Sequence, residues 1–386
     1  MRIGIILNQY PVHSETFIQS FLDHLNNREL TIFARLTAAP YQNKHWRFKP
    51  YLNRIPNAYQ LFQYIKTFFS VFIFCNRWIK LKQKGIPLKQ LIADAGIWTT
   101  PSLDVLHFPF ANNAFGREHY AAALGAKMTL SFRGSDLNVY PIYHNKSYSQ
   151  LWPYVHKVQC NSAELAEKLK EHNIPEHIPI EIIPPALRID LQAVVPAKMD
   201  MERIGTPENP LVIVTLGRLH WVKDYPLALR IMSELKKSGI QFRYHILGEG
   251  ADREQLMFLV HALGLHQEVY MHGRANAADI RQQLSHAHIY LQTSLAEGFS
   301  NACLEAQAFG LPCVVPAISG MNACIEDGKT GIIVPVRTEK AFAEAILTVM
   351  SNIQAYNTAY TSARIKQLFS LESQKQQWLN FFDRLF

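Results

Sequence analysis

Short, mostly apolar runs recur along the chain, and each is followed by a polar loop and then by a stretch whose apolar positions have helical spacing. These runs lie at residues 2–7, 104–110, 129–133, 158–162, 211–216, 242–247 and 288–293. The runs at residues 2–7, 211–216 and 288–293 are mostly apolar rather than alternating, which is typical of strands buried on both faces of a parallel sheet. Strands that alternate with helices in this way predict an α/β fold.

The chain is long enough for two domains. Its 386 residues exceed what one hydrophobic core usually serves. A polar, proline-containing stretch over residues 184–210 is typical of a linker. We therefore expect an N-terminal domain over residues 1–190 and a C-terminal domain over residues 205–361.

Residues 288–315 place two carboxylates around the start of one helix. The pattern predicts a strand, a loop with Glu297, and a helix that Asn301 caps and that carries Glu305 about one turn in. The backbone N–H groups of residues 300–303 would form an anion site at the positive end of the helix dipole. This order suits a phosphate-linked sugar, although the spacing fits equally well two glutamates that only cap the helix and lie on its surface.

The run from Glu297 to Glu305, Glu-Gly-Phe-Ser-Asn-Ala-Cys-Leu-Glu, followed by Ala306, Gly310 and Pro312, resembles the E-x7-E signature of the retaining glycosyltransferases of family 4. The resemblance implies the GT-B fold, with two Rossmann-like domains whose parallel sheets face each other across a cleft. It also implies that the last helix, at about residues 362–386, crosses back to the first domain.

The resemblance also implies a donor site in the C-terminal domain. Glu305 would bind the ribose hydroxyls and Glu297 the hydroxyls of the donor sugar, while Arg218 and Lys223 would neutralise the diphosphate. Asp224 stands where the family often has glycine. The other implied donor-binding residues are Gly217, Gly248, Gly250, His272, Gly298, Phe299, Ser300 and Asn301.

Residues of the N-terminal domain resemble the family's acceptor side. Ser14, Glu15 and Thr16 begin an S-E-T-F sequence like that of polysaccharide-assembling members. His107 stands where the family has His-x-His, with proline in place of the second histidine, and Arg133 replaces the histidine of a His-Gly-x-Asp motif. These five residues are the implied acceptor-binding set. Asp136, the acid of that motif, would orient the acceptor hydroxyl, act as its base, or merely cap the following turn.

The positive charge is concentrated in the N-terminal part of the chain. Residues 1–90 hold 13 lysines and arginines against 3 aspartates and glutamates, whereas residues 201–386 hold 17 of each. Basic and aromatic residues mix in segments 41–51 and 60–84, which fits either an anionic membrane surface as partner or a solvated basic edge of a domain. No nucleic-acid recognition motif accompanies the charge, so nucleic acid is not an expected partner.

The start of the chain lacks the apolar core of a signal peptide, and its five cysteines have no metal-like or paired spacing. These features predict a cytoplasmic protein, peripheral on the inner face of the plasma membrane if the basic segments bind lipid.

The resemblance to family 4 implies a retaining, metal-independent hexosyltransferase. Its catalytic residues would be Glu297, His107, Asp136, Arg218 and Lys223. It would use a UDP- or GDP-linked sugar as substrate, without a cofactor, and a glycan or lipid-linked acceptor in the assembly of a cell-surface lipopolysaccharide or exopolysaccharide. No D-x-D pair that could hold a metal occurs in the sequence.

Three other functions are weighed against this one. A GT-B-type sugar-nucleotide epimerase would share the carboxylates, and a non-catalytic membrane-associated scaffold would share the basic surface. A dinucleotide-dependent oxidoreductase would need a complete G-x-G-x-x-G, but the G-x-G at Gly248 and Gly250 is followed by Arg253.

Overall fold

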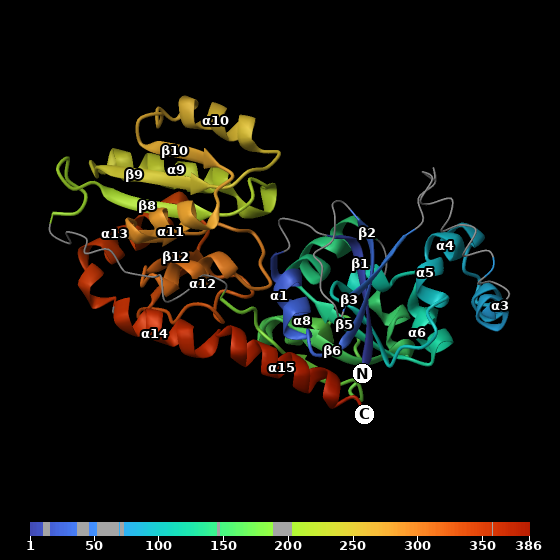
Figure 1. Cartoon of the computed structure of the whole chain (residues 1–386). Coiled ribbons are helices and arrows are strands. Elements are labelled where there is room, and N and C mark those ends of the chain that lie inside the picture. The colour runs from blue at the N-terminus through green and yellow to red at the C-terminus, as the bar shows by residue number, and fades with distance from the viewer. Residues whose placement is uncertain are drawn as a thin grey trace. The chain divides into compact units, whose positions relative to one another are not determined.

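The computed structural model describes residues 1–10, 16–36, 46–51, 69, 73–144, 147–187, 203–356 and 358–386 (Figure 1). The chain divides into two compact units. Unit 1 comprises Met1–Pro184 and Gln374–Phe386, and unit 2 comprises Pro185–Ser373. The acceptor-binding and donor-binding roles expected for the two domains stay predictions.

The described strands of unit 1 form one seven-stranded sheet in the order β3-β2-β1-β4-β5-β6-β7. Every neighbouring pair in this sheet is parallel. The strands are β1 (Arg2–Tyr10), β2 (Glu29–Leu36), β3 (Trp46–Pro50), β4 (Val105–Phe108), β5 (Lys127–Phe132), β6 (Val155–Cys160) and β7 (Ile180–Ile182). The chain therefore builds the sheet outward from β1 in both directions, as in a doubly wound fold.

Helices cover both faces of this sheet. Successive side chains of a strand point to opposite faces, so neighbouring residues of β1 contact different helices. Ile3 and Ile5 of β1 pack with α1 and α15 on one face, whereas Ile6 packs with α3 to α6 and α8 on the other. The helices are α1 (Thr16–His24), α3 (Cys75–Gln83), α4 (Leu88–Ala93), α5 (Ala95–Trp98), α6 (Glu118–Leu124), α7 (Tyr140–Tyr143), α8 (Ala163–Lys170) and, at the end of the chain, α15 (Leu371–Asp383).

The described strands of unit 2 form a six-stranded, all-parallel sheet in the order β10-β9-β8-β11-β12-β13. The strands are β8 (Leu211–Leu216), β9 (Phe242–Leu247), β10 (Val269–Gly273), β11 (Ile289–Leu291), β12 (Cys313–Pro316) and β13 (Gly331–Val334). The helices are α9 (Tyr225–Lys237), α10 (Arg253–Ala262), α11 (Ala277–Ser285), α12 (Asn301–Ala308), α13 (Glu339–Ser351) and α14 (Thr358–Leu368). Ile213 of β8 packs with α9, α10 and α13, and Val214 packs with α11 and α12, so this sheet is also buried on both faces. The predicted α/β class with two parallel sheets is confirmed.

The last helix returns to unit 1, as the sequence predicts. The single helix expected at the end of the chain is two helices, because α14 ends at Leu368 and α15 begins at Leu371. Trp378, Phe381 and Phe382 of α15 are buried against the β1 face of the unit 1 sheet. Aromatic burial of this extent holds the helix on the first unit although its sequence lies at the far end of the chain.

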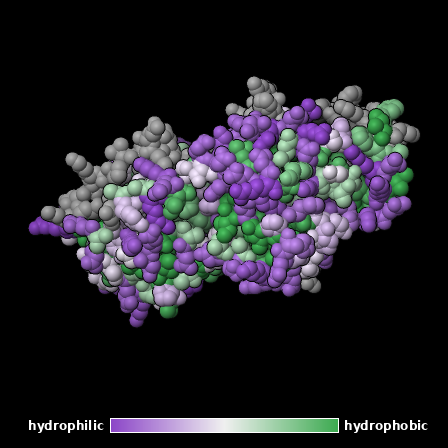
Figure 2. All heavy atoms as spheres, turned by 90° about the horizontal axis from the view of Figure 1, so that it is seen from below, coloured by the Kyte–Doolittle hydropathy of each residue, from purple (hydrophilic) through white to green (hydrophobic). Residues whose placement is uncertain are grey.

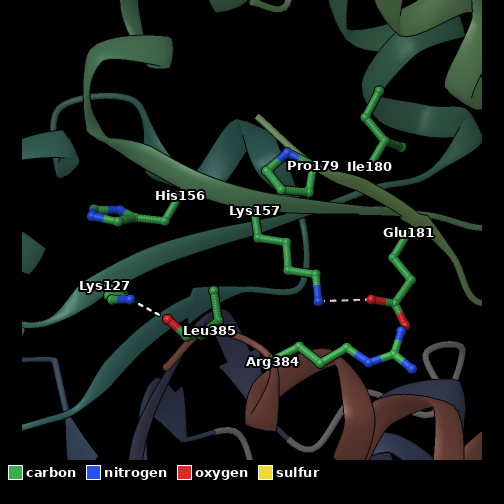
Figure 3. Close-up of a pocket in the computed structure, with 8 residues that line it drawn as sticks. All are labelled: Lys127, His156, Lys157, Pro179, Ile180, Glu181, Arg384 and Leu385. Atoms are coloured by element: carbon green, nitrogen blue, oxygen red, sulfur yellow. Dashed lines mark hydrogen bonds and ion pairs between the residues drawn. The ribbon is translucent and has the colours of Figure 1, made fainter. Parts of the chain in front are cut away.

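Two lysines hold the last turn of α15 and the residues that follow it. Figure 3 shows the pocket beside it, of about 490 Å³, lined by Lys127, His156, Lys157, Pro179, Ile180, Glu181, Arg384 and Leu385. Lys157 Nζ donates to the carbonyl oxygen of Phe381 at 2.9 Å and pairs with Glu181 at 2.7 Å. Lys127 Nζ donates to the carbonyl oxygen of Leu385. Cations at this position satisfy carbonyl groups that have no partner within the helix and complement the helix dipole.

The basic segments separate into different structures. Within segment 41–51, Trp46–Pro50 form strand β3, in which Trp46 is only 6% exposed. Of segment 60–84, residues 60–68 and 70–72 lie outside the described residues, and Cys75–Gln83 form α3. In the part of the chain that the structure describes, no helix is long and apolar enough to cross a bilayer.

His107 lies on β4 with 0% exposure. Its Nδ1 is 2.9 Å from Thr129 Oγ1, and the rings of Trp378 and Phe382 lie edge-on to it with centroids 5.7 and 5.4 Å away. Burial, and to a smaller extent the charge of Arg133, lowers the pKa of His107 from 6.5 to about 3, so the imidazole is neutral. The His107 side chain is therefore packed in the core of unit 1. Its expected contact with the acceptor stays a prediction, and it would require this core to open.

We predict that His107 makes the stability of the protein depend on acid pH. Because the folded pKa lies below the unfolded value, the unfolded state binds more protons between about pH 3 and 6.5, and stability falls as the pH falls through this range. Relative to a His107→Phe variant, the wild-type free energy of unfolding should drop by about 2 kcal/mol between pH 7.5 and 5. Urea unfolding of both proteins across this range measures the difference, and parallel pH profiles would show that His107 is accessible to protons in the folded state.

Candidate functional site

The candidate donor residues of unit 2 gather at one edge of its sheet. The strand order reverses between β8 and β11, and ligands bind at such a point in open α/β sheets. Because all the strands are parallel, their carboxyl ends share an edge. Arg218 follows β8, Gly248 follows β9, His272 lies near the end of β10, and Glu297 lies in the loop after β11. The structure thus brings the loops that carry these four residues to the same side of unit 2.

The centre of this edge is an ion pair between Lys223 Nζ and Glu297 Oε1. The two side chains are 21% and 14% exposed. Glu297 Oε1 also accepts hydrogen bonds from Gln292 Nε2 at 3.0 Å and from Ser294 Oγ at 2.8 Å. Gln292 and Ser294 are themselves buried, so the carboxylate is held in one orientation by donors on its own loop and by a cation from the loop after β8.

The same network continues to the start of α12. Ser300 Oγ donates to Gln292 Oε1 at 2.6 Å and accepts from the Cys303 N–H group at 3.2 Å. Ser300 is therefore the N-cap, and the prediction that Asn301 caps the helix is wrong. The backbone of Ser300 is extended, with φ −104° and ψ 100°, whereas Asn301 is already the first helical residue. Glu305 lies one turn further along α12 and is partly exposed.

The two glycines of the G-x-G sequence let backbone pack against backbone. A Cβ atom on Gly248 would lie 1.8 Å from the carbonyl oxygen of Gly217, and one on Gly250 would lie 2.0 Å from that of Leu219. The Leu219 N–H group donates to the carbonyl oxygen of Glu249 at 2.9 Å across the same contact. The loops after β8 and β9 thus touch too closely for any side chain, which explains both glycines without a phosphate. Their contact with a donor stays a prediction.

A second ion pair, which the sequence does not indicate, joins the loop after β8 to the loop after β13, and its arginine also contacts the loop after β11. Arg337 donates to Asp224 Oδ2 at 2.7 Å and to the carbonyl oxygens of Ser294 and Thr293 at 2.7 and 2.8 Å. No motif indicates Arg337, because its partner lies 113 residues away. Asp224 also caps α9 by accepting from the Leu227 N–H group at 3.3 Å.

Asp224 has a left-handed backbone with φ +47°. Glycine adopts this region without strain, and aspartate is one of the few other residues that tolerate it. The departure from the family's glycine at this position therefore keeps the backbone conformation and adds the partner of Arg337.

Three further donor candidates have definite positions. The ring of Phe299 packs edge-on against Phe369, with centroids 5.5 Å apart. Gly298 is buried where its carbonyl oxygen would lie 2.7 Å from a Cβ on Gly320. His272 Nε2 is 2.8 Å from His245 Nδ1 on the neighbouring strand. These contacts fix the loops locally, and the expected donor contacts of the three residues stay predictions.

The acceptor candidates of unit 1 lie only partly within the described residues. Ser14 and Glu15 lie outside them, as does the side chain of Thr16. The Arg133 guanidinium stacks 3.8 Å from the ring centroid of Phe17, and its Nε donates to the carbonyl oxygen of Pro109 at 3.1 Å. Arg133 is thus held at the carboxyl end of β5.

Asp136 is fully buried in the turn after β5. It accepts hydrogen bonds from the Arg133 and Asn112 backbone N–H groups at 3.0 and 3.2 Å. Burial raises its pKa to about 6, although these hydrogen bonds act in the opposite direction. The contacts are those of a residue that caps its turn, which was one of its expected roles. A role as base toward the acceptor stays a prediction.

Among the described residues, no three histidine, cysteine, aspartate or glutamate side chains converge where they could hold a metal ion.

Comparisons with known proteins bear directly on this arrangement. The sequence family described as Glycosyl transferases group 1 matches residues 197–366. Over 379 residues the chain is 25% identical to the Escherichia coli K12 protein described as a colanic acid biosynthesis glycosyltransferase, WcaL, covering 90% of each chain. It is 27% identical over 253 residues to the amylovoran biosynthesis glycosyltransferase AmsK of Erwinia amylovora, covering 63% of this chain and 60% of AmsK.

The fold is also found in solved structures. That of Anabaena HepE in complex with UDP-glucose matches over 100% of both chains with a TM-score of 0.74 and 16% sequence identity. Residues 197–366 therefore form a glycosyl transferases group 1 domain, and the chain is a glycosyltransferase with the GT-B fold.

Proposed function

We propose that this glycosyltransferase moves a sugar from a nucleotide-diphosphate sugar to a hydroxyl of a glycan or lipid-linked acceptor, with retention of configuration and without a metal ion. The observation that carries the proposal is the Lys223–Glu297 ion pair, which lies beside the N-terminus of α12 at the carboxyl edge of the unit 2 sheet. A cation, a carboxylate and a helix N-terminus in this arrangement suit a sugar joined to a diphosphate.

The diphosphate would bind at the start of α12. The first N–H groups of a helix have no partner within the helix. That of Cys303 donates to Ser300 Oγ, so the groups that would face a phosphate are those of Asn301 and Ala302. Arg218, which is exposed after β8, would add a second cation. Glu305 would accept hydrogen bonds from the ribose hydroxyls.

Donor binding would rearrange the central ion pair. Lys223 would exchange Glu297 for a phosphate oxygen, and Glu297 would then accept hydrogen bonds from the hydroxyls of the donor sugar. Gln292 and Ser294 would keep the carboxylate in place during this exchange, because they contact it independently of Lys223. The ion pair thus serves as a preorganised site whose two charges each find a new partner in the substrate.

In the chemical step, the bond between the sugar's anomeric carbon and the phosphate oxygen breaks while the acceptor oxygen bonds to that carbon on the same face. The acceptor proton passes to the leaving phosphate oxygen. Lys223, Arg218 and the α12 N–H groups would stabilise the negative charge that develops on the diphosphate, so that the protein needs to supply neither a metal nor a nucleophile.

The comparisons suggest which substrates to test first. HepE was solved with UDP-glucose, so UDP-sugars are the first donors to examine and GDP-sugars the second. WcaL and AmsK are described as enzymes of colanic acid and amylovoran biosynthesis, so we propose that the acceptor belongs to the assembly of a cell-surface polysaccharide.

We expect Glu305→Ala to lower sugar transfer about 100-fold, because two hydrogen bonds to a charged group are lost. The same variant should lose most of the thermal stabilisation that UDP or GDP gives to the wild-type protein. Glu344→Ala is a matched control, because Glu344 is an exposed glutamate on α13 of the same unit. Transfer at the wild-type rate in Glu305→Ala would contradict the assignment of Glu305 to the donor site. Isomerisation of the donor in the absence of any acceptor would favour an epimerase.

We expect Arg337→Gln to weaken donor binding, although in the proposed site Arg337 itself does not contact the donor. Losing its ion pair and two carbonyl contacts should lower the free energy of unfolding by about 2–4 kcal/mol and let the loops that carry Lys223 and Glu297 separate. The KM for the donor should then rise more than kcat falls. Arg230→Gln, which changes an exposed arginine on α9, should alter neither. An unchanged KM in a destabilised Arg337→Gln protein would show that Arg337 stabilises the fold but does not position the site.

A further inference from the structure

One surface of unit 1 combines exposed apolar side chains with lysines. Its apolar members are Ile73, Ile79, Leu88 and Ile92, which are 76%, 44%, 51% and 38% exposed. Its lysines are Lys80, Lys82, Lys84 and Lys89, all exposed. We call these eight residues the α3–α4 surface. Figure 1 places α3 and α4 next to each other, and Figure 2 shows hydrophobic and hydrophilic atoms side by side over the end of unit 1 where they lie.

The inner side of α3 is firmly attached, so that its outer side is a fixed surface. Leu81 is 1% exposed, and Trp78 packs against the same core. The Arg77 guanidinium donates to the carbonyl oxygens of Thr100 and Pro101 at 2.5 and 2.6 Å. The one arginine of α3 is therefore used to hold the helix, whereas its lysines point away from the body of unit 1.

The charge of this surface is not balanced by its own part of the chain. No aspartate or glutamate occurs between Glu29 and Asp94. Asp94 itself is 1% exposed and pairs with Arg117 at 3.0 Å. No acidic residue of this part of the chain therefore offsets the positive charge of the four lysines.

We propose that the α3–α4 surface docks on a lipid bilayer that contains anionic phospholipids. Lysine ammonium groups would contact the phosphates of the headgroups, and the isoleucine and leucine side chains would enter the boundary between headgroups and acyl chains. A nucleic acid would satisfy the lysines equally well, but it would leave the four aliphatic side chains in water. The exposed aliphatic residues thus favour the bilayer.

None of the eight residues belongs to the candidate donor or acceptor sites, so the proposal stands apart from the proposed function. It can be tested without any sugar substrate. A protein docked in this way would work on acceptors that are themselves held at the membrane.

Vesicle flotation with the full chain tests the proposal. Vesicles of phosphatidylcholine alone should bind little protein, whereas vesicles with 30% phosphatidylglycerol should bind it at 50 mM salt and clearly less at 500 mM, because salt screens the charges. In the charge variant Lys80→Gln/Lys82→Gln, the partition coefficient at low salt should fall about 30-fold, at roughly fivefold for each lysine. The matched control Lys340→Gln/Lys366→Gln, which changes two exposed helical lysines of unit 2, should bind like the wild type.

A second pair of variants separates apolar insertion from charge. Ile73→Gln/Leu88→Gln should weaken binding at both salt concentrations, whereas Met257→Gln/Phe258→Gln, at 52% and 75% exposed positions of α10, should not. The proposal is overturned if the wild type does not float with anionic vesicles at low salt, or if the control variants lose as much binding as the surface variants. It is also overturned if a polyuridine competitor binds the surface and the vesicles do not.

Discussion

Two ion pairs that share the loop after β8 hold the candidate site of unit 2 together. Lys223 contacts Glu297, and Asp224, the next residue, contacts Arg337, which in turn holds the carbonyl groups of the loop that carries Glu297. In the proposed function, the donor exchanges the partners of the first pair, while the second pair continues to hold the loop that carries Glu297.

Close packing between backbone segments also holds these loops together. Gly248 and Gly250 bring the loops after β8 and β9 within direct contact, and Gly320, with φ +85°, brings another loop against Gly298. Each contact occurs where a Cβ atom would collide with a backbone carbonyl group. Glycines that resemble ligand-binding positions in the sequence are thus also required for the loops to meet at the edge of the sheet, and the two roles do not conflict.

The cations of unit 1 serve three different purposes. Lys157 holds the last turn of α15 and Lys127 the residues after it, Arg77 fixes α3 to its neighbours, and the lysines of the α3–α4 surface are exposed. The net charge of the N-terminal part of the chain does not show which of its cations hold the fold together and which are exposed to solvent. Only the lysines that remain exposed beside aliphatic side chains suggest a partner, and this is why the membrane proposal rests on α3 and α4.

The sequence by itself determined the alternation of buried strands and helices, the parallel sheets and the glycosyltransferase segment around Glu297 and Glu305, whereas the return of the C-terminal helix was implied only by the family resemblance of that segment. These are properties of local patterns, because periodicity, capping residues and short motifs act over a few neighbouring residues. It did not determine that Ser300 rather than Asn301 caps α12, that His107 points into an aromatic core, or that Arg337 holds Asp224. Those outcomes depend on which face of a strand meets which helix and on partners more than a hundred residues apart. Only the tertiary structure decided them, because burial and charge pairing are set by the whole fold and not by any one segment.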